Sequence, residues 1–345
     1  MNVNRADTLF AKASDVKLRD HMLDTKRGLK HGYDNISTDA LQNTLALASG
    51  SNQIGGRAFN SILTSIEKNK HKNSEFSKLW KKLQYGFEEA VDFLVNHIYV
   101  KNPSLLPSQN IYTLLSYFFF LNQSRANPRQ IKEIKKWFWY TACGERYSGS
   151  AFNRNIPEDI KFFKRLANSN TARFNIRERI NSIDFFKTEY RKSSSKSNAY
   201  FILLRNKKPM YLINGQEMML DEASSISNRK DRHHIFPNAM LRRQQISLKW
   251  INSICNICYL ESDENQSISD THPRKYLHKY KKRKHFGKVM RSHMIPVDRD
   301  SPVWNTNLKQ SYLKFLNIRG NLILKEIERL AGVKIFEKFD EIKRL

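Results

Sequence analysis

The chain has 345 residues, of which 40% are hydrophobic and 12% aromatic, which is enough for one large domain or two ordinary ones. Twelve glycines and nine prolines exclude a fibrous or low-complexity protein. Sixty Lys and Arg against 33 Asp and Glu give a formal net charge of +27, and both halves are basic. Such an excess favours a polyanionic partner, because phosphate neutralisation supplies most non-specific affinity for nucleic acid. A lysine-rich composition without such a partner is the alternative.

The cysteine content and the length of the apolar segments indicate the cellular compartment of the protein. The three cysteines, Cys143, Cys255 and Cys258, provide no even disulfide framework, which is typical of a reducing cytoplasm. The polar N-terminus lacks the apolar core of a signal peptide. The longest apolar run, residues 111–121, is too short to span a bilayer. We therefore expect a soluble, cytoplasmic protein with no membrane partner.

The first half of the chain predicts a helical domain. Residues 1–57 are weakly patterned, with short helices expected near 15–23 and 37–47. Apolar residues at three- and four-residue steps predict a long helix from Phe76 to Ile98 with Ser74 as its N-cap. The further expected helices are a buried one over 111–121, one that begins at Asn127-Pro128, and two at 157–166 and 176–186.

The serine-rich segment 193–197 is the best internal boundary, which predicts a helical domain over 1–195 and a second domain over 196–345. Residues 200–213 fit either a hairpin or a helix end followed by one strand. The tail has two helical patterns that are separated near Arg319-Gly320. The expected fold class is mostly α with a small embedded β element, in the α+β class.

The most informative stretch lies between Asp231 and Asn265. His233 and His234 precede the apolar step Ile235-Phe236-Pro237. Neighbouring strand residues point to opposite faces, so both histidines can serve one site only where the strand ends or bulges. Proline cannot continue a central ladder, which makes a strand end here reasonable.

Phosphodiester cleavage needs a general base, a divalent cation at the scissile phosphate, and a group that holds the base in the right tautomer. Histidine suits the first role because its pKa lies near neutrality. His233 and His234, together with Asn256 and Asn265, can fill these roles in one site.

This stretch resembles the HNH, or ββα-metal, nucleases, and most of all the HNH-type C-terminal domain of GmrSD-like restriction endonucleases. The likeness covers about residues 55–280 and is strongest at 231–277; upstream, segments such as Trp137-Phe138-Trp139 and Arg146-Tyr147-Ser148 resemble the helical region that precedes the nuclease domain. The resemblance implies a strand–loop–strand–helix site. In it His234 is the general base, His233 and Asn265 are metal ligands, and Asn256 on the second strand supports the loop and the histidine.

The resemblance also implies an activity and its requirements. The expected function is metal-dependent endonuclease cleavage of DNA in bacterial restriction or anti-phage defence. Mg²⁺ is the expected cofactor, with Mn²⁺ or another transition metal as alternatives. A catalytically silent nucleic-acid-binding subunit of a larger defence complex is the competing function, and RNA is a competing substrate.

One departure from the family matters. GmrSD-like proteins usually begin with a ParB-like, nucleotide-dependent domain that carries an Asp-Gly-Gln-Gln-Arg motif, and this sequence has none. The resemblance therefore leads us to expect the C-terminal part alone, either as a fragment or as one subunit of a split system whose nucleotide-binding or sensor subunit is a separate partner.

Two further features leave alternatives open. Cys255 and Cys258 form a lone Cys-x-x-Cys, which would need outlying histidines such as His272 and His293 to bind structural zinc. A dense basic run after the histidine motif is expected to contact the nucleic-acid backbone, with a solvated face as the alternative reading. Its residues are Lys281, Lys282, Arg283, Lys284, Lys288 and Arg291.

Overall fold

The computed structural model describes residues 18–58, 62, 73–169, 171–191, 194–220, 232–260 and 268–344. The protein is mostly helical, with one small two-stranded antiparallel sheet in this part of the chain. It divides into two compact units, Met1–Asn175 and Ile176–Leu345. None of the described helices combines the length and the apolar character needed to cross a lipid bilayer.

The division lies before residue 176, whereas the sequence analysis places the boundary after residue 195. Residues 176–195 belong to the second unit because their backbone is bonded into it. Ile180 forms a bridge with Phe336, and the Tyr190 amide donates to the Asn252 carbonyl at 2.7 Å.

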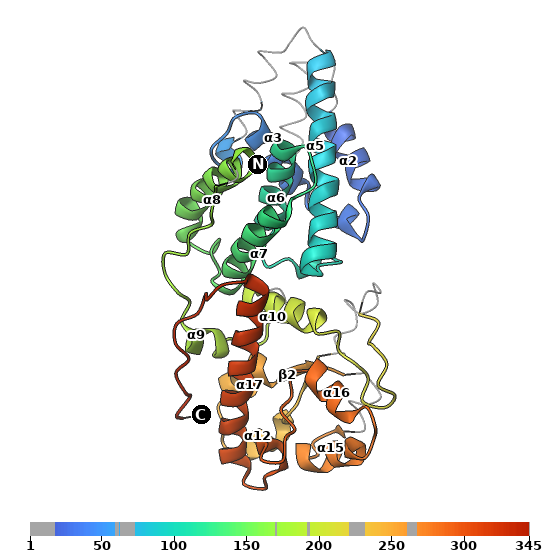
Figure 1. Ribbon diagram of the computed structural model, residues 1–345, viewed down its shortest axis with the longest axis vertical. Helices are drawn as coiled ribbons and strands as arrows, with labels where there is room; N and C mark the ends of the chain where they lie inside the picture. Colours follow the sequence, from blue (N-terminus) through green and yellow to red (C-terminus); the bar gives the residue numbers. More distant parts are fainter. Residues whose placement is uncertain are drawn as a thin grey trace. The chain divides into compact units, whose positions relative to one another are not determined.

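The first unit is a helical array around α6. This helix packs against α3, α5 and α8, and Figure 1 shows it among them. The helices of the unit are α2 (Leu18–Gly28), α3 (Thr38–Ala48), α5 (Asn73–Phe93), α6 (Gln109–Asn122), α7 (Pro128–Cys143) and α8 (Ala151–Asn168). Short 3-10 turns occur at Tyr33–Asn35, Gly56–Ala58 and Pro103–Leu105, and a π-helical turn, Leu94–Ile98, continues α5.

Local sequence rules account for most of these helices. All of 111–119 is buried in α6, as its apolar pattern predicts. Asn127 caps α7 through a capping box with Gln130, so the Asn-Pro prediction is confirmed. Helix α5 begins at Asn73, one residue before the expected cap. It crosses α6 closely at Gly86, where an added Cβ would lie 2.6 Å from the Ser116 carbonyl oxygen.

A buried carboxylate fixes the end of α7 against α8. Asp159 is 1% exposed and accepts hydrogen bonds from the Trp137 indole at 3.0 Å, the Tyr147 hydroxyl at 2.5 Å and the Arg146 guanidinium at 2.8 Å. Burial of an ionised carboxylate is tolerated only when it is paired and hydrogen-bonded in this way. The Arg146-Tyr147 segment therefore has a structural role in the first unit.

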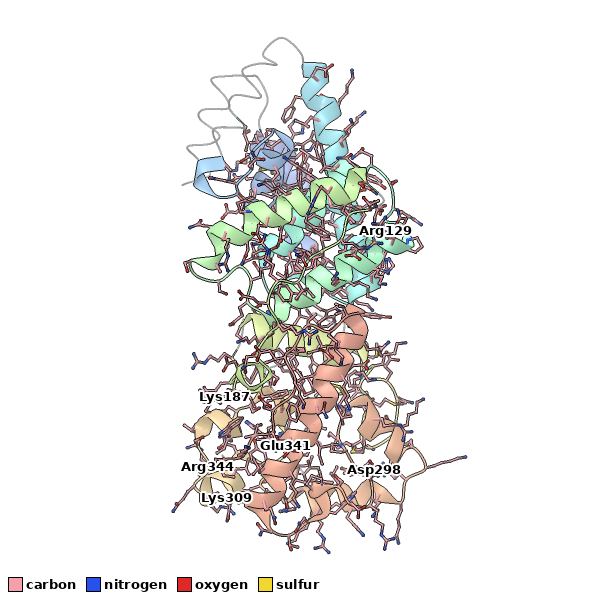
Figure 2. The ribbon with its side chains drawn as sticks, turned by 60° about the vertical axis from the view of Figure 1, so that its left-hand side comes forward. Arg129, Lys187, Asp298, Lys309, Glu341 and Arg344 are labelled. Atoms are coloured by element: carbon pink, nitrogen blue, oxygen red, sulfur yellow. The ribbon has the colours of Figure 1, made fainter. Side chains whose placement is uncertain are left out.

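The second unit surrounds a long C-terminal helix, α17, as Figure 1 shows. Its helices are α9 (Ser182–Phe186), α10 (Ser195–Asn206), α12 (Asn238–Arg243), α13 (Leu248–Ile251), α15 (Pro273–Lys281), α16 (Phe286–Ser292) and α17 (Leu308–Ala331). Its strands are β1 (Arg232–His234) and β2 (Ile257–Tyr259), and 3-10 turns occur at Ile254–Asn256 and Pro302–Trp304. Lys309, labelled in Figure 2, lies in the first turn of α17.

The small sheet has a simple register. Strands β1 and β2 are antiparallel, with His233 opposite Cys258 and His234 opposite Ile257. Strand β1 ends at His234, and Pro237 then caps α12. The expected strand end before the proline is therefore confirmed.

Two elements of the second unit differ from the sequence analysis. Residues 176–181 are not helical, because Ile180 pairs with Phe336 instead, and α9 covers only Ser182–Phe186. The tail contains one helix rather than two. It continues through Gly320, where a Cβ would lie 2.9 Å from the Phe186 ring. The glycine marks a close helix contact, not a helix end.

The neighbouring residue in α17, Arg319, is fully buried. Its guanidinium donates to the Cys255 carbonyl at 2.5 Å, the Tyr200 hydroxyl at 2.8 Å, the His293 carbonyl at 3.0 Å and the Met294 carbonyl at 3.3 Å. One side chain thus joins α17 to α10, to the turn before β2 and to the end of α16.

We expect Arg319→Ala to unfold the second unit at a markedly lower temperature. Each buried carbonyl that loses its donor costs about 1–3 kcal/mol, so the total loss should exceed about 3 kcal/mol. Thermal denaturation followed by circular dichroism measures it.

The matched control is Arg329→Ala in the same helix. Arg329 is 65% exposed and pairs with Glu326 at 2.8 Å, so its loss should cost at most about 1 kcal/mol. Equal melting temperatures for the two variants would contradict the role given to Arg319.

Candidate active site

Asn256 holds the loop that follows β1. It is fully buried, and its side-chain amide both accepts from the Phe236 amide at 2.9 Å and donates to the Phe236 carbonyl at 3.0 Å. The same amide donates to the Ile251 carbonyl at 3.0 Å, and the Asn256 carbonyl accepts from the Ile235 amide at 2.8 Å. Asn256 lies in the 3-10 turn just before β2. It therefore supports the loop after the two histidines and does not itself bond to an imidazole.

A different asparagine orients His234. The His234 Nε2 atom lies 3.0 Å from Oδ1 of Asn252, the residue that caps the C-terminus of α13. An amide oxygen only accepts, so Nε2 must carry the hydrogen and Nδ1 keeps the lone pair. The backbone of Asn252 is fixed in turn by the Tyr190 amide, which donates to its carbonyl at 2.7 Å. The arrangement leaves His234 Nδ1 as the basic atom.

Burial also sets the protonation state of this imidazole. Desolvation lowers the pKa of His234 below its ordinary value near 6.5, and the Asn252 hydrogen bond raises it by a smaller amount. The ring is therefore mainly neutral at pH 7, which is the form that a general base requires.

Only one of the two predicted metal ligands lies among the residues that the structure describes. His233 is 9% exposed and lies beside His234 on β1. Asn265, the other expected ligand, and Asp231 lie outside the described residues. No group of three or more His, Cys, Asp or Glu side chains that could hold a metal occurs in the described ranges. An imidazole is a ligand for later transition metals, whereas an amide oxygen suits Mg²⁺ or Mn²⁺, so this pair of donors does not by itself select the metal.

The cysteine pair belongs to the core. Cys255 and Cys258 are both buried thiols that form no disulfide. Burial raises the pKa of the Cys255 thiol to about 12. Both side chains are almost fully buried, which favours packing in the core as their role.

The six basic residues of the predicted nucleic-acid contact occupy the end of α15, the start of the next turn and α16. All six are exposed, and none forms a salt bridge with a described carboxylate: Lys281, Lys282, Arg283, Lys284, Lys288 and Arg291. The Lys281 ammonium lies 4.6 Å from the Trp304 ring centre, and the indole of Trp304 donates to the carbonyl of Asp298, which Figure 2 labels. A polyanion can reach these charges without breaking a described ion pair.

Comparison with known proteins adds little on function. No family model matches the chain. An uncharacterized protein of the archaeon Methanocaldococcus jannaschii is 24% identical over 224 residues, which cover 58% of this chain and 37% of that protein. The chain thus spans little more than a third of the length of the curated relative that it matches.

Asn252 is the site residue that sequence reasoning misses. It lies beside Ser253 in the segment Trp250–Ile254, where two polar residues between apolar ones are a weak sign of a specific hydrogen bond. Its contact with His234 joins residues 18 positions apart, with the helices α12 and α13 between them. No local pattern predicts that contact.

We expect Asn252 to set both the tautomer and the pKa of His234. Asn252→Ala should lower the pKa further, because it removes a hydrogen bond that favours the charged ring. Asn252→Asp should raise it, because a carboxylate stabilises an adjacent imidazolium. Side-chain ¹H–¹⁵N NMR measures both properties, with the Nε2–H tautomer expected in the unaltered protein. An Nδ1–H tautomer there would contradict the assignment.

Proposed function

We propose that the second unit is a metal-dependent endonuclease of the HNH type that cleaves DNA phosphodiester bonds, in a bacterial restriction or anti-phage role. The observation that carries this proposal is the oriented His234 imidazole. It is held through Nε2 by Asn252, it is neutral at pH 7, and it stands where β1 ends in a loop clamped by Asn256.

The residues can divide the chemistry as follows. Nδ1 of His234 accepts a proton from a water molecule as the water oxygen attacks phosphorus, and one phosphorus–oxygen ester bond breaks. The Asn252 hydrogen bond holds the ring so that Nδ1 stays basic, and it stabilises the imidazolium that forms. The hydrogen bonds of Asn256 hold the loop after β1 in a fixed position relative to the His234 imidazole. This position matters because a small displacement of a general base lowers the reaction rate by a large factor.

A divalent cation is part of this proposal. His233 and Asn265 would hold it. When bound, it would polarise the phosphate and stabilise the leaving oxygen.

The charge of the chain supports a nucleic-acid substrate. The formal charge is +27, and the six residues of the basic run between Lys281 and Arg291 are exposed. Cleavage of RNA is the competing activity, since backbone charge does not distinguish it from DNA. A silent nucleic-acid-binding subunit is the competing class; in that case the His234 imidazole would be a structural group only.

We expect His234→Ala to lose about 10²–10⁴-fold in cleavage rate, which is the usual contribution of a general base, and to keep its affinity for DNA. The measurement is plasmid cleavage with Mg²⁺ or Mn²⁺, paired with a binding assay. His31→Asn is the control, because His31 is an exposed histidine of the first unit in a left-handed conformation that asparagine tolerates. Wild-type cleavage by the His234 variant would exclude this base.

Replacement of Lys281, Lys282, Arg283 and Lys284 by alanine should weaken DNA binding and flatten its salt dependence, because about 0.9 counterions are released for each neutralised phosphate. The matched control removes four exposed lysines elsewhere in the second unit, Lys309, Lys314, Lys338 and Lys343. Fluorescence anisotropy over a range of salt concentrations measures the slopes. Equal slopes for the two variants would show that the basic run is only a solvated face.

A further inference from the structure

A cavity of about 500 Å³ lies at the start of α15. It is lined by His272, Arg274, Lys275 and His278, together with Thr306 from the loop before α17. Four of these five side chains are basic or can become so, and none is acidic. Arg274, Lys275 and His278 are exposed, and they form no ion pair with any carboxylate in the described ranges. The cavity therefore collects positive charge that nothing described neutralises.

His272 lines this cavity and carries a hydrogen-bond donor that is not satisfied within the described residues. Its Nδ1 accepts from the Arg274 amide at 3.1 Å, so Nδ1 is unprotonated and Nε2 carries the hydrogen. The Nε2 atom is buried and has no hydrogen-bond partner among the described residues. A buried donor without an acceptor is unfavourable, and an anionic oxygen that reached it would supply the missing acceptor. Burial, and to a smaller extent the charges of Arg274 and Lys275, lower the pKa of His272 below its ordinary value.

The cavity is fixed to the candidate active site. Tyr276, in the first half of α15, donates its hydroxyl hydrogen to the Ile235 carbonyl at 2.7 Å. Ile235 directly follows His234. The His272 ring also lies 6.1 Å from the Phe236 ring, centre to centre. A group bound in the cavity is thus held on the same rigid framework as the imidazole.

We propose that this cavity binds a phosphate group of the nucleic-acid backbone next to the bond that is cut. The inference rests on the proposed nuclease function and deepens it, because it names the residues that place the substrate. Arg274 and Lys275 would neutralise the phosphate, while His272 Nε2 and the Thr306 hydroxyl would donate to its oxygens. The basic run at the end of α15 would contact phosphates farther along the strand.

The test compares two variants of the full chain that each remove one exposed arginine and one exposed lysine. Arg274→Ala/Lys275→Ala alters the cavity. Lys343→Ala/Arg344→Ala is the matched control in the same unit, and Figure 2 labels Arg344. Both carry the His234→Ala change, so that DNA is not cut during the measurement. Salt-dependent anisotropy with a short duplex gives the number of phosphates that each variant contacts.

We expect the cavity variant to lose at least fivefold in affinity and to reduce the salt slope by about 1, which corresponds to one phosphate, whereas the control should stay within twofold. Titration with inorganic phosphate, followed through the His272 side-chain NMR signals, should shift Nε2–H. Arg274→Ala/Lys275→Ala, which keeps the His272 ring as the reporter, should lose that response, whereas Lys343→Ala/Arg344→Ala should keep it.

Other results would overturn the inference. Equal effects of the two double variants on DNA affinity would mean that the DNA is bound by diffuse surface charge and not by the cavity. A phosphate response without any change in the DNA slope would mean a site for free phosphate or a mononucleotide. Normal metal-dependent cleavage by the cavity variant on an otherwise unaltered background, with normal DNA binding, would reject the cavity and leave the nuclease proposal intact. Cavity-dependent DNA binding without cleavage by the unaltered protein would reject the nuclease and keep the cavity as a binding surface.

Discussion

The buried guanidinium of Arg319 is the constraint on which the second unit depends. A cation removed from water needs compensation, and here it comes from the carbonyl groups of Cys255, His293 and Met294 and from the Tyr200 hydroxyl rather than from any described carboxylate. Two of these carbonyls lie at the C-terminal end of α16, where the helix dipole favours positive charge. The N–H donors of the planar guanidinium point in fixed directions. Only one arrangement of α10, the turn before β2 and the end of α16 can therefore satisfy them.

The hydrogen bonds of Arg319 also help to hold the candidate site in place. The carbonyl of Cys255 is fixed by the guanidinium, and the side-chain amide of the next residue, Asn256, bonds to both the amide and the carbonyl of Phe236. Tyr276 holds the adjacent Ile235 carbonyl from the other side. The loop after the histidines is thus bonded on both sides by buried groups. A small sheet of two three-residue strands could not supply this order alone, since an isolated pair of strands is marginally stable.

Local chemistry explains what could be predicted from the sequence. The Asn127 cap and the end of β1 before Pro237 follow from rules that operate within a few residues. The same local rules predict a helix end at Gly320, because a glycine in an amphipathic pattern suggests one, and this prediction is wrong. The Phe186 ring fills the space in which a side chain of residue 320 would lie, and no local pattern shows that contact. Asn252 could not be found because its role is a contact between distant residues. The sequence alone points to the histidine pair as the candidate site, whereas the side chain that hydrogen-bonds to His234 can be identified only from the fold.

Burial and charge have separate roles in the proposed site, and this separation shapes how it would respond to its surroundings. The His234 imidazole is kept neutral mainly by desolvation, which salt screens weakly. The six basic residues from Lys281 to Arg291 named above are exposed and unpaired with described carboxylates, so their attraction for phosphate is strongly screened by salt. Ionic strength should therefore act on substrate binding, whereas pH should act on the chemical step. A silent binding subunit would keep the first dependence and would have no chemical step for pH to change.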